Sequence, residues 1–297
     1  MTVAVLPEVA GALADGAAVV ALESTIFSPF GLPAPANREA LDRCVAAVRA
    51  GGGVPAVTAV LDGVARVGLG PDEHDRILTG GVKVAERDLP VAIAQRTAVG
   101  VTTVSASLAL AATAGVRVFA TGGIGGVHRG AEVTGDVSAD LGAIAAHPVV
   151  TVSAGAKAFL DIPRTLEHLE TLGVPVLGWR TDDFPMFWCR SSGLAVPHRV
   201  DDASDVVRVA SAQRALGATS GALLAVPIPE DAALDRREVE GALARAVAEA
   251  GTGAGATPKV LAALADATGG RTVPANIALA EHNASVAAAV AREFNKM

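Results

Sequence analysis

Aromatic residues and cysteines are scarce in this sequence, and both shortages exclude classes of protein. Aromatic side chains make up 3% of the 297 residues, tyrosine is absent, and no basic patch carries interleaved aromatics. Nucleic-acid binding through phosphate neutralisation or base stacking is therefore not expected. The two cysteines, Cys44 and Cys189, form no CxxC pair and are too few for a disulfide framework. We expect a cytoplasmic protein with reduced thiols.

Long hydrophobic runs are missing as well. Glycine, proline or a charged residue interrupts each apolar run before it reaches the roughly 20 residues that a helix needs to span a bilayer. The first residues carry acids where a secretory signal has basic residues. We therefore expect no membrane association. Because 51% of the residues are hydrophobic and the net charge is a modest −7, the chain can bury a sizeable core.

Lysine is the third scarce residue. Of the 24 basic residues only four are lysines, namely Lys83, Lys157, Lys259 and Lys296. Unlike arginine, lysine can lose its proton in a suitable site and attack a carbon atom. Lys157 follows an apolar, strand-like run, which makes it a candidate nucleophile. The alternative is that these lysines have no special role and occur by chance in an arginine-rich composition. This alternative is stronger for Lys83.

Strand-like apolar runs alternate with helical patterns along the chain. The runs predicted as buried strands are residues 17–22, 54–60, 64–67, 116–120, 148–152, 174–179 and 221–226. The segments predicted as helices are residues 7–15, 38–50, 72–78, 87–95, 102–114, 164–172, 201–216, 236–250, 258–267 and 276–294. Asp62-Gly63 between two strands is a hairpin signal. The pattern predicts one α/β domain over residues 1–297, with three layers (α/β/α) and a mixed, mainly parallel central sheet.

Three groups that could take part in catalysis or ligand binding follow predicted strands. Glu23 comes after the strand at 17–22, a glycine-rich loop begins at Thr121 after the strand at 116–120, and Lys157 comes after the strand at 148–152. Because ligands bind beyond the carboxyl ends of parallel strands, we expect an active site there. Lys157 suits Schiff-base chemistry and Glu23 suits the role of general acid. Lys83 is a candidate for a neighbouring cation or for a phosphate contact.

The glycine-rich loop leads into a polar segment with candidate metal ligands. Asp136 and Asp140 are four residues apart, so on a helix they share one face and suit Mg²⁺ or Mn²⁺. The alternative is an acidic helix N-terminus with Ser138 in its first turn. His128 is either a phosphate ligand or a structural hydrogen-bonding group. A dinucleotide site is not expected, because His128 interrupts the GxGxxG pattern that begins at Gly123.

Several motifs together resemble one family, and the resemblance covers nearly the whole chain. They are ALEST at 21–25, GLPAPAN at 31–37, KVAERDLP at 83–90, VTTVSAS at 101–107, FATGGIGGVHRGAE at 119–132, DVSADL at 136–141, SAGAK at 153–157, PIPE at 227–230 and ANIAL at 275–279. The chain resembles the pseudouridine-5′-phosphate glycosidase family, which includes the indigoidine synthase A-like proteins. The block at 119–132 is the most specific of these motifs.

The resemblance implies a three-layer α/β/α fold, a homotrimer, one Mn²⁺ per subunit and the activity of a pseudouridylate synthase, of the carbon–oxygen lyase class. That activity cleaves pseudouridine 5′-phosphate reversibly to uracil and ribose 5-phosphate. The resemblance also assigns roles to residues. It makes Lys157 the Schiff-base nucleophile, Glu23 the proton donor and Asp136 the metal ligand, acting through water. It places substrate contacts at Lys83, Val104, Ser138, Ala139, Asp140, Thr121, His128 and Asn276.

The chain also departs from the family pattern. Residues 28–33, SPFGLP, form a loop one residue longer than the usual SHGMP, and the loop lacks its histidine. Because this loop follows Glu23, we expect it to affect base preference. The rival hypotheses are another Schiff-base lyase that acts on a sugar phosphate, and a non-catalytic sugar-phosphate-binding protein.

Overall fold

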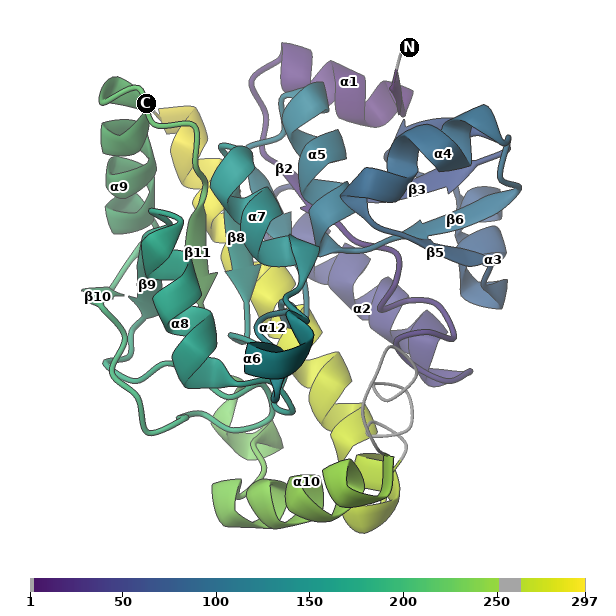
Figure 1. The fold of residues 1–297 in the computed structure, drawn as a ribbon. Coiled ribbons are helices and arrows are strands. Elements are labelled where there is room, and N and C mark those ends of the chain that lie inside the picture. The colour runs from purple at the N-terminus through teal and green to yellow at the C-terminus, as the bar shows by residue number, and fades with distance from the viewer. Residues whose placement is uncertain (1–2, 251–262, 297) are drawn as a thin grey trace.

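A central sheet organises the fold, which a computed structural model describes over residues 3–250 and 263–296 (Figure 1). In that part of the chain eleven strands join in one sheet. Nine of them follow the order β1-β4-β3-β2-β7-β8-β11-β9-β10, while β6 pairs with β3 and β5 pairs with β6. The strands are β1 Ala4–Val5, β2 Val19–Leu22, β3 Val54–Leu61, β4 Val64–Val67, β5 Val82–Val84, β6 Val99–Thr102, β7 Val118–Ala120, β8 Val150–Ser153, β9 Val176–Trp179, β10 His198–Val200 and β11 Ala222–Ala225.

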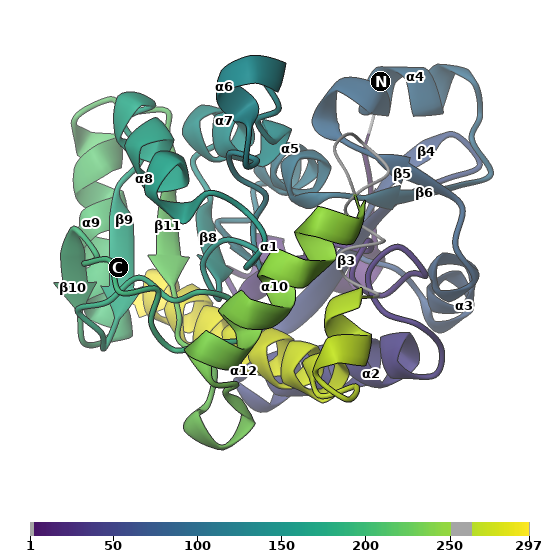
Figure 2. The ribbon, with the colours of Figure 1, turned by 60° about the horizontal axis from the view of Figure 1, so that its bottom comes forward.

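Helices cover both faces of this sheet. They are α1 Pro7–Ala14, α2 Ala36–Ala50, α3 Pro71–Thr79, α4 Leu89–Ala94, α5 Val104–Ala114, α6 Ala131–Thr134, α7 Ala139–Ala146, α8 Ile162–Thr171, α9 Ala203–Ala215, α10 Arg236–Ala250 and α12 Thr272–Glu293. Figure 1 shows α5, α7 and α8 in front of the central strands and α12 behind them. The turned view in Figure 2 shows the same separation, with α2 beside α12. The predicted three-layer architecture is therefore confirmed.

The sheet is mainly parallel, as its apolar strands predict. The neighbouring pairs β2–β7, β7–β8, β8–β11 and β11–β9 are all parallel. All four residues of β2, β8 and β11 are buried, which is typical of strands covered on both faces. Among the named strands of the described chain, antiparallel pairing is confined to β3, which pairs in this way with β4 and β6.

The hairpin that makes the sheet mixed was predicted correctly. Asp62 and Gly63, between β3 and β4, have φ angles of 53° and 77°. Two consecutive positive φ angles fit the type I′ turn, whose twist matches that of the flanking strands. Asparagine, aspartate and glycine tolerate this left-handed conformation best.

Four described strands were not predicted, namely β1, β5, β6 and β10, and two of them, β5 and β6, lie between residues 80 and 103. Unlike the equally short β2, β7 and β8, these two strands lie in no continuous apolar run, because Lys83 interrupts β5 and Gly100 interrupts β6. The helix expected at 102–114 begins two residues later, at Val104. Of the predicted helix at 258–267, residues 263–267 are helical and residues 258–262 lie outside the described residues. No helix in the described part of the chain is both long and apolar enough to cross a membrane.

Candidate active site

A cavity of about 530 Å³ lies beyond the carboxyl ends of β2, β6, β7 and β8. It is lined by most of the residues that the sequence predicts for the site. These are Glu23, Lys83, Val104, His128, Asp136, Ser138, Ala139, Asp140 and Lys157. They come from segments far apart in sequence, which meet because parallel strands end at the same edge of a sheet. The cavity is therefore the candidate active site.

Glu23 is the buried acid of this cavity. Its side chain follows β2, the residue is 6% exposed, and the hydroxyl of Thr121 donates a hydrogen bond to Oε1. Burial raises the pKa of Glu23, while the positive charge of Lys157 and the hydrogen bond from Thr121 act in the opposite direction. A carboxyl group with a raised pKa holds its proton at a higher pH than an exposed one. Glu23 is therefore suited to donate a proton.

Two lysines face the same cavity as this acid. Lys83 lies in the edge strand β5, and Lys157 follows β8 and is partly buried. Burial lowers the pKa of Lys83, and the charge of Lys157 lowers it further. The two amines are thus close enough to influence each other, and both influence Glu23. A buried acid and two amines in one cavity are the groups that Schiff-base chemistry needs.

Backbone hydrogen bonds fix the segment that carries Lys157. The N–H of Ile124 donates to Gly155 O at 3.0 Å, and the N–H of Lys157 donates to Ile124 O at 3.1 Å. The loops after β7 and β8 therefore run side by side beyond the sheet. Gly155 has a φ of 76°, and a side chain there would meet the carbonyl of Pro185. This glycine is required by both conformation and space.

Asp140 ties two loops of the cavity together. It is buried, its Oδ2 accepts from the N–H of Gly125 at 2.8 Å, and its Oδ1 accepts from the N–H of Ser105 at 3.1 Å. Ser138 caps α7, because its Oγ accepts from the N–H of Asp140 at 3.2 Å. Both oxygens of Asp140 thus have backbone partners, and its carboxylate shapes the cavity wall.

The prediction that Asp136 and Asp140 share a helix face is wrong. Helix α7 begins at Ala139, so Asp136 lies in the loop before it. Ser138 is the N-cap residue and accepts a hydrogen bond there, so the helix starts after Ser138 and does not include Asp136. Asp136 instead approaches His128, with 3.8 Å between Oδ2 and Nδ1.

The donor set for a cation is small. Within residues 3–250 and 263–296, no group of three or more His, Cys, Asp or Glu side chains gathers closely enough to hold a metal ion. Asp136 is half exposed at the cavity, and His128 is its neighbour. One carboxylate open to solvent fits an ion such as Mn²⁺ or Mg²⁺ that keeps most of its water ligands. It does not fit an ion enclosed by protein side chains.

Two predicted site residues do not line the cavity. Thr121 contacts the site through Glu23, because its hydroxyl donates a hydrogen bond to the carboxyl group of that lining residue. Asn276 lies in α12, and its Oδ1 accepts a hydrogen bond from Trp188 Nε1 at 2.7 Å. Lining residues that were not predicted include Thr25, Arg87, Thr103, Ser105 and Phe159. Arg87 adds a further cation to the lining. Its position four residues after Lys83 in the KVAERDLP motif is the sequence feature that could have identified it as a site residue.

Comparisons with known proteins agree over nearly the whole chain. A family model described as "Indigoidine synthase A like protein" matches residues 8–293. The chain is 50% identical over 291 residues to a Herpetosiphon aurantiacus protein named pseudouridine-5′-phosphate glycosidase, covering 96% of this chain and 95% of that one. It is 49% identical over 300 residues to a protein of the same name from Chloroflexus aurantiacus, covering 98% of both chains.

Solved structures show the same fold. The chain matches the prealnumycin C-glycosynthase AlnA in complex with ribulose 5-phosphate with a TM-score of 0.92 and 36% identity, over 100% of this chain and 98% of that one. It matches an indigoidine synthase A (IdgA)-like protein from Thermotoga maritima with a TM-score of 0.89 and 33% identity, over 99% of this chain and 97% of that one.

Proposed function

The chain belongs to the indigoidine synthase A like family, and from this premise we propose that it cleaves pseudouridine 5′-phosphate reversibly to uracil and ribose 5-phosphate. The observation that carries the proposal is the presence of Glu23 and Lys157 in one cavity of a chain that is 50% identical to a protein named for this activity. The substrate has a C–C bond between ribose C1′ and uracil C5, so cleavage needs more than the two carboxylates that serve an ordinary glycosidase.

The proposed route passes through a covalent bond to Lys157. The uncharged Nζ attacks C1′, the bond from C1′ to the ring oxygen breaks, and a proton passes from the nitrogen to that oxygen, which becomes a hydroxyl and leaves the nitrogen with a lone pair. The nitrogen lone pair then forms a C=N bond to C1′ as the C1′–C5 bond breaks. C5 keeps the electron pair of that bond and receives a proton from Glu23, and uracil leaves. Water hydrolyses the remaining imine to ribose 5-phosphate and free Lys157, so the route is that of a lyase rather than a direct hydrolysis.

The buried state of Glu23 supports its role as the acid. A carbon atom such as uracil C5 needs a positioned proton donor, and burial keeps Glu23 protonated at a higher pH than an exposed carboxyl group. We assign substrate contacts to Lys83, Val104, Ser138, Ala139, Asp140 and His128, which line the cavity. Thr121 and Asn276 complete the predicted set, although neither lines the cavity: Thr121 contacts Glu23, and Asn276 contacts Trp188.

Mn²⁺ is the metal that we propose, with one ion per subunit. Asp136 would hold it through water ligands, and His128, whose Nδ1 lies 3.8 Å from Asp136 Oδ2, is a further candidate donor. The ion would supply positive charge near the anionic substrate. Lys83 and Arg87 line the same cavity and supply positive charge of their own for a phosphate group. We further propose a homotrimer located in the cytoplasm.

A second candidate is synthesis of a C–C glycosidic bond to an acceptor other than uracil. The structural match to a C-glycosynthase in complex with ribulose 5-phosphate favours it. Incubation of the protein with uracil and ribose 5-phosphate separates the candidates from each other and from a non-catalytic binding protein. Formation of pseudouridine 5′-phosphate together with uracil release in the reverse assay supports the glycosidase. If ribose 5-phosphate reacts only with acceptors other than uracil, the glycosidase proposal fails.

Borohydride trapping tests the covalent step. Reduction during turnover should add the mass of a reduced ribose phosphate to the peptide that contains Lys157. Lys157→Ala should give no adduct and no turnover. Lys83→Gln is the matched control, because it removes the other cavity lysine, and it should still give the adduct at Lys157 at saturating substrate. Full turnover with no adduct on any lysine would eliminate the imine.

A further inference from the structure

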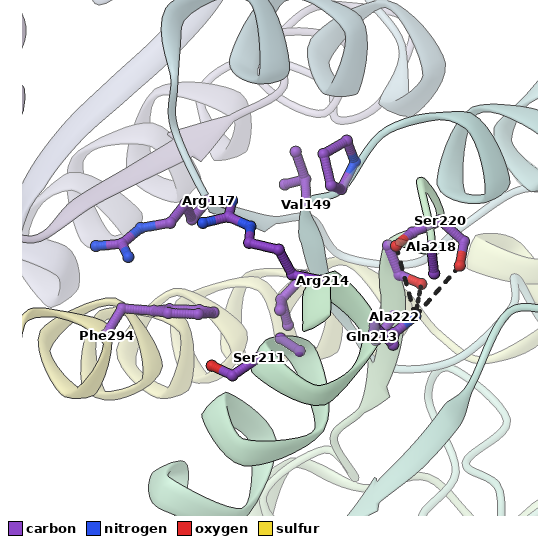
Figure 3. Close-up of a pocket in the computed structure, with 13 residues that line it drawn as sticks. Arg117, Val149, Ser211, Gln213, Arg214, Ala218, Ser220, Ala222 and Phe294 are labelled. Atoms are coloured by element: carbon purple, nitrogen blue, oxygen red, sulfur yellow. Dashed lines mark hydrogen bonds between the residues drawn. The ribbon is translucent and has the colours of Figure 1, made fainter. Parts of the chain in front are cut away.

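A second cavity lies at the opposite end of the sheet from the candidate active site. Its volume is about 200 Å³, and it lies where β7, β8 and β11 begin, between α9 and Phe294 (Figure 3). The two cavities share no lining residue. A role for the second cavity is therefore separate from the proposed reaction.

Two arginines give this cavity its charge. Arg117 directly precedes β7, and Arg214 lies in the last turn of α9. Figure 3 shows both side chains at one end of the cavity, next to Phe294. The guanidinium of Arg117 lies 4.7 Å from the centre of the Phe294 ring and donates to Asn295 Oδ1 at 3.2 Å. Arg117 is thus held in place by groups that do not cancel its charge.

Neither guanidinium has an acidic partner. In the described part of the chain no carboxylate lies within 4.0 Å of Arg117 or Arg214. By contrast, Arg43, Arg76 and Arg199 each pair with acids. The acids of this chain outnumber its basic residues by 31 to 24, so the lack of acidic partners for Arg117 and Arg214 is specific to this cavity.

The two charges also act on each other. Burial lowers the pKa of Arg117, and the positive charge of Arg214 lowers it further. Like charges that share a partly buried space raise the free energy of the folded state. An anion between them would remove that cost and would gain charge-assisted hydrogen bonds, for which the planar guanidinium group is well suited.

The other end of the cavity is neutral and fixed. The Gln213 amide donates to the backbone oxygen of Gly221 and to Ser220 Oγ, each at 3.2 Å, as the dashed lines in Figure 3 show. Pro148 and Val149 contribute apolar surface. A cavity of this size is smaller than the 300 to 1,000 Å³ typical of drug-sized ligands. It has room for a phosphate group with at most a small substituent.

We propose that Arg117 and Arg214 form a binding site for a small dianionic oxyanion, inorganic phosphate or a small phosphate monoester. This site lies at the amino ends of β7 and β8, whose carboxyl ends lead to Thr121 and Lys157. Because Arg214 is exposed and makes no ion pair within the described residues, its replacement should not disturb folding. Arg214→Gln is therefore a better test than a change at Arg117, which also contacts Phe294.

Thermal unfolding in inorganic phosphate provides the affinity test, with sodium chloride at matched ionic strength as the reference. Ligands that bind only the folded state stabilise it by RT ln(1 + c/Kd) at a free ligand concentration c, so the rise of the unfolding midpoint with phosphate concentration reports the dissociation constant. Arg214→Gln should weaken the phosphate response of the wild type at least about tenfold in apparent dissociation constant. Arg208→Gln is the matched control, because Arg208 is also exposed on α9 but pairs with Asp205. It should respond as the wild type does.

The location of the anion needs a second measurement. Crystals soaked in tungstate, a heavy phosphate analogue, should show anomalous density between Arg117 and Arg214 in the wild type and none there in Arg214→Gln. Parallel titrations with methyl phosphate decide whether the site takes a monoester or inorganic phosphate alone. An equal phosphate response in all three proteins, or density only in the catalytic cavity, would overturn the proposal. The comparison does not depend on the proposed reaction, because all three proteins keep the same active site.

Discussion

Glu23 combines a catalytic requirement with a cost in stability. Burial raises the pKa of its carboxyl group, so the folded protein binds this proton more tightly than the unfolded chain does. The free energy of unfolding must then fall as the pH rises from the ordinary carboxyl range through the raised pKa, because the unfolded chain releases its proton first. Below the ordinary range both states are protonated and the cost disappears.

We predict opposite effects of Glu23→Gln on activity and on stability. Turnover should fall at least about 100-fold, because glutamine cannot donate the proton. The variant should be more stable than the wild type at pH 8, and this difference should shrink as the pH approaches 4. Urea unfolding at a series of pH values, with uracil release measured in parallel, checks both effects. A stability difference that does not change with pH would contradict the proposed state of Glu23.

Thr121 should act through Glu23 rather than on the substrate. Its hydroxyl donates to Oε1, and this hydrogen bond lowers the pKa of the carboxyl group against the larger effect of burial. In Thr121→Val we therefore expect the alkaline limb of the activity profile to move to higher pH, and kcat to fall about tenfold as the carboxyl loses its fixed orientation. KM for ribose 5-phosphate in the synthetic direction should stay unchanged.

Serine at the same position provides the control. Thr121→Ser keeps the hydroxyl group and should keep the wild-type pH profile. Thr121 would instead be a direct substrate contact if Thr121→Val raised KM and left the pH profile where it was.

At the scale of elements, residue pattern predicted strands that lie in a continuous apolar run better than strands that do not. The apolar runs around Val20, Phe119 and Val152 are buried on both faces, so their composition alone identifies central strands. Lys83 lies in a three-residue strand, β5, whose only described neighbour is β6. Two of these three residues are exposed, so no apolar run separates the strand from a loop, whereas the equally short β7 is fully buried. The partner and the pairing register of β5 depend on tertiary contacts that lie outside that segment.

The start of α7 shows how the packing of two elements shapes the cavity. A Cβ atom on Gly125 would lie 2.2 Å from Ser138 Oγ and 2.8 Å from Asp140 Oδ2. The loop after β7 can therefore approach the helix cap only with glycine at this position. The same contact lets the N–H of Gly125 reach the carboxylate of Asp140. Because Gly125 has no side chain, the loop after β7 reaches Asp140 in α7. Asp140 also accepts a hydrogen bond from Ser105 in α5, so it connects all three elements.

Two glycine-to-alanine substitutions around α7 should therefore have opposite signs. Gly125→Ala should destabilise the protein by about 1 to 3 kcal/mol, because the buried carboxylate of Asp140 loses a partner. It should also weaken turnover. Gly142→Ala, on the exposed side of α7 with no atom within 4 Å of the added Cβ, should stabilise the protein by about 0.5 to 1 kcal/mol. Chemical unfolding of both variants checks the pair, and equal effects would contradict this account of the cap.

At the scale of the whole molecule, the sequence located the site better than it described the surroundings of each residue. Glu23 and Lys157 were predicted together because each follows a central strand, and parallel strands bring such positions to one edge. Spacing alone placed Asp136 on a helix, but the helix cap at Ser138 excludes it. The partner that holds Asn276, Trp188, is 88 residues away in the chain, so no local pattern could reveal it.

The proposed assembly and its metal can be tested in one experiment. If three chains each hold one Mn²⁺, native mass spectrometry of the protein in manganese acetate should show a trimer with up to three ions. Asp136→Asn should remain a trimer and lose the ions, because Asp136 lies in an exposed loop and supports no helix. Mn²⁺ should raise the unfolding midpoint of the wild type but not that of Asp136→Asn, and chelation should lower turnover in the wild type.

Glu132→Gln is the matched control for this experiment. Glu132 is an exposed acid in α6, close in sequence to Asp136, but it pairs with Arg164 and does not line the cavity. Its replacement should leave metal content and the Mn²⁺-dependent rise in unfolding midpoint as in the wild type. Retention of three ions by Asp136→Asn would move the metal to other ligands, and a monomer at all concentrations would rule out the trimer. Loss of the ions from both variants would mean that the general negative charge of the loop, rather than one carboxylate, attracts the cation.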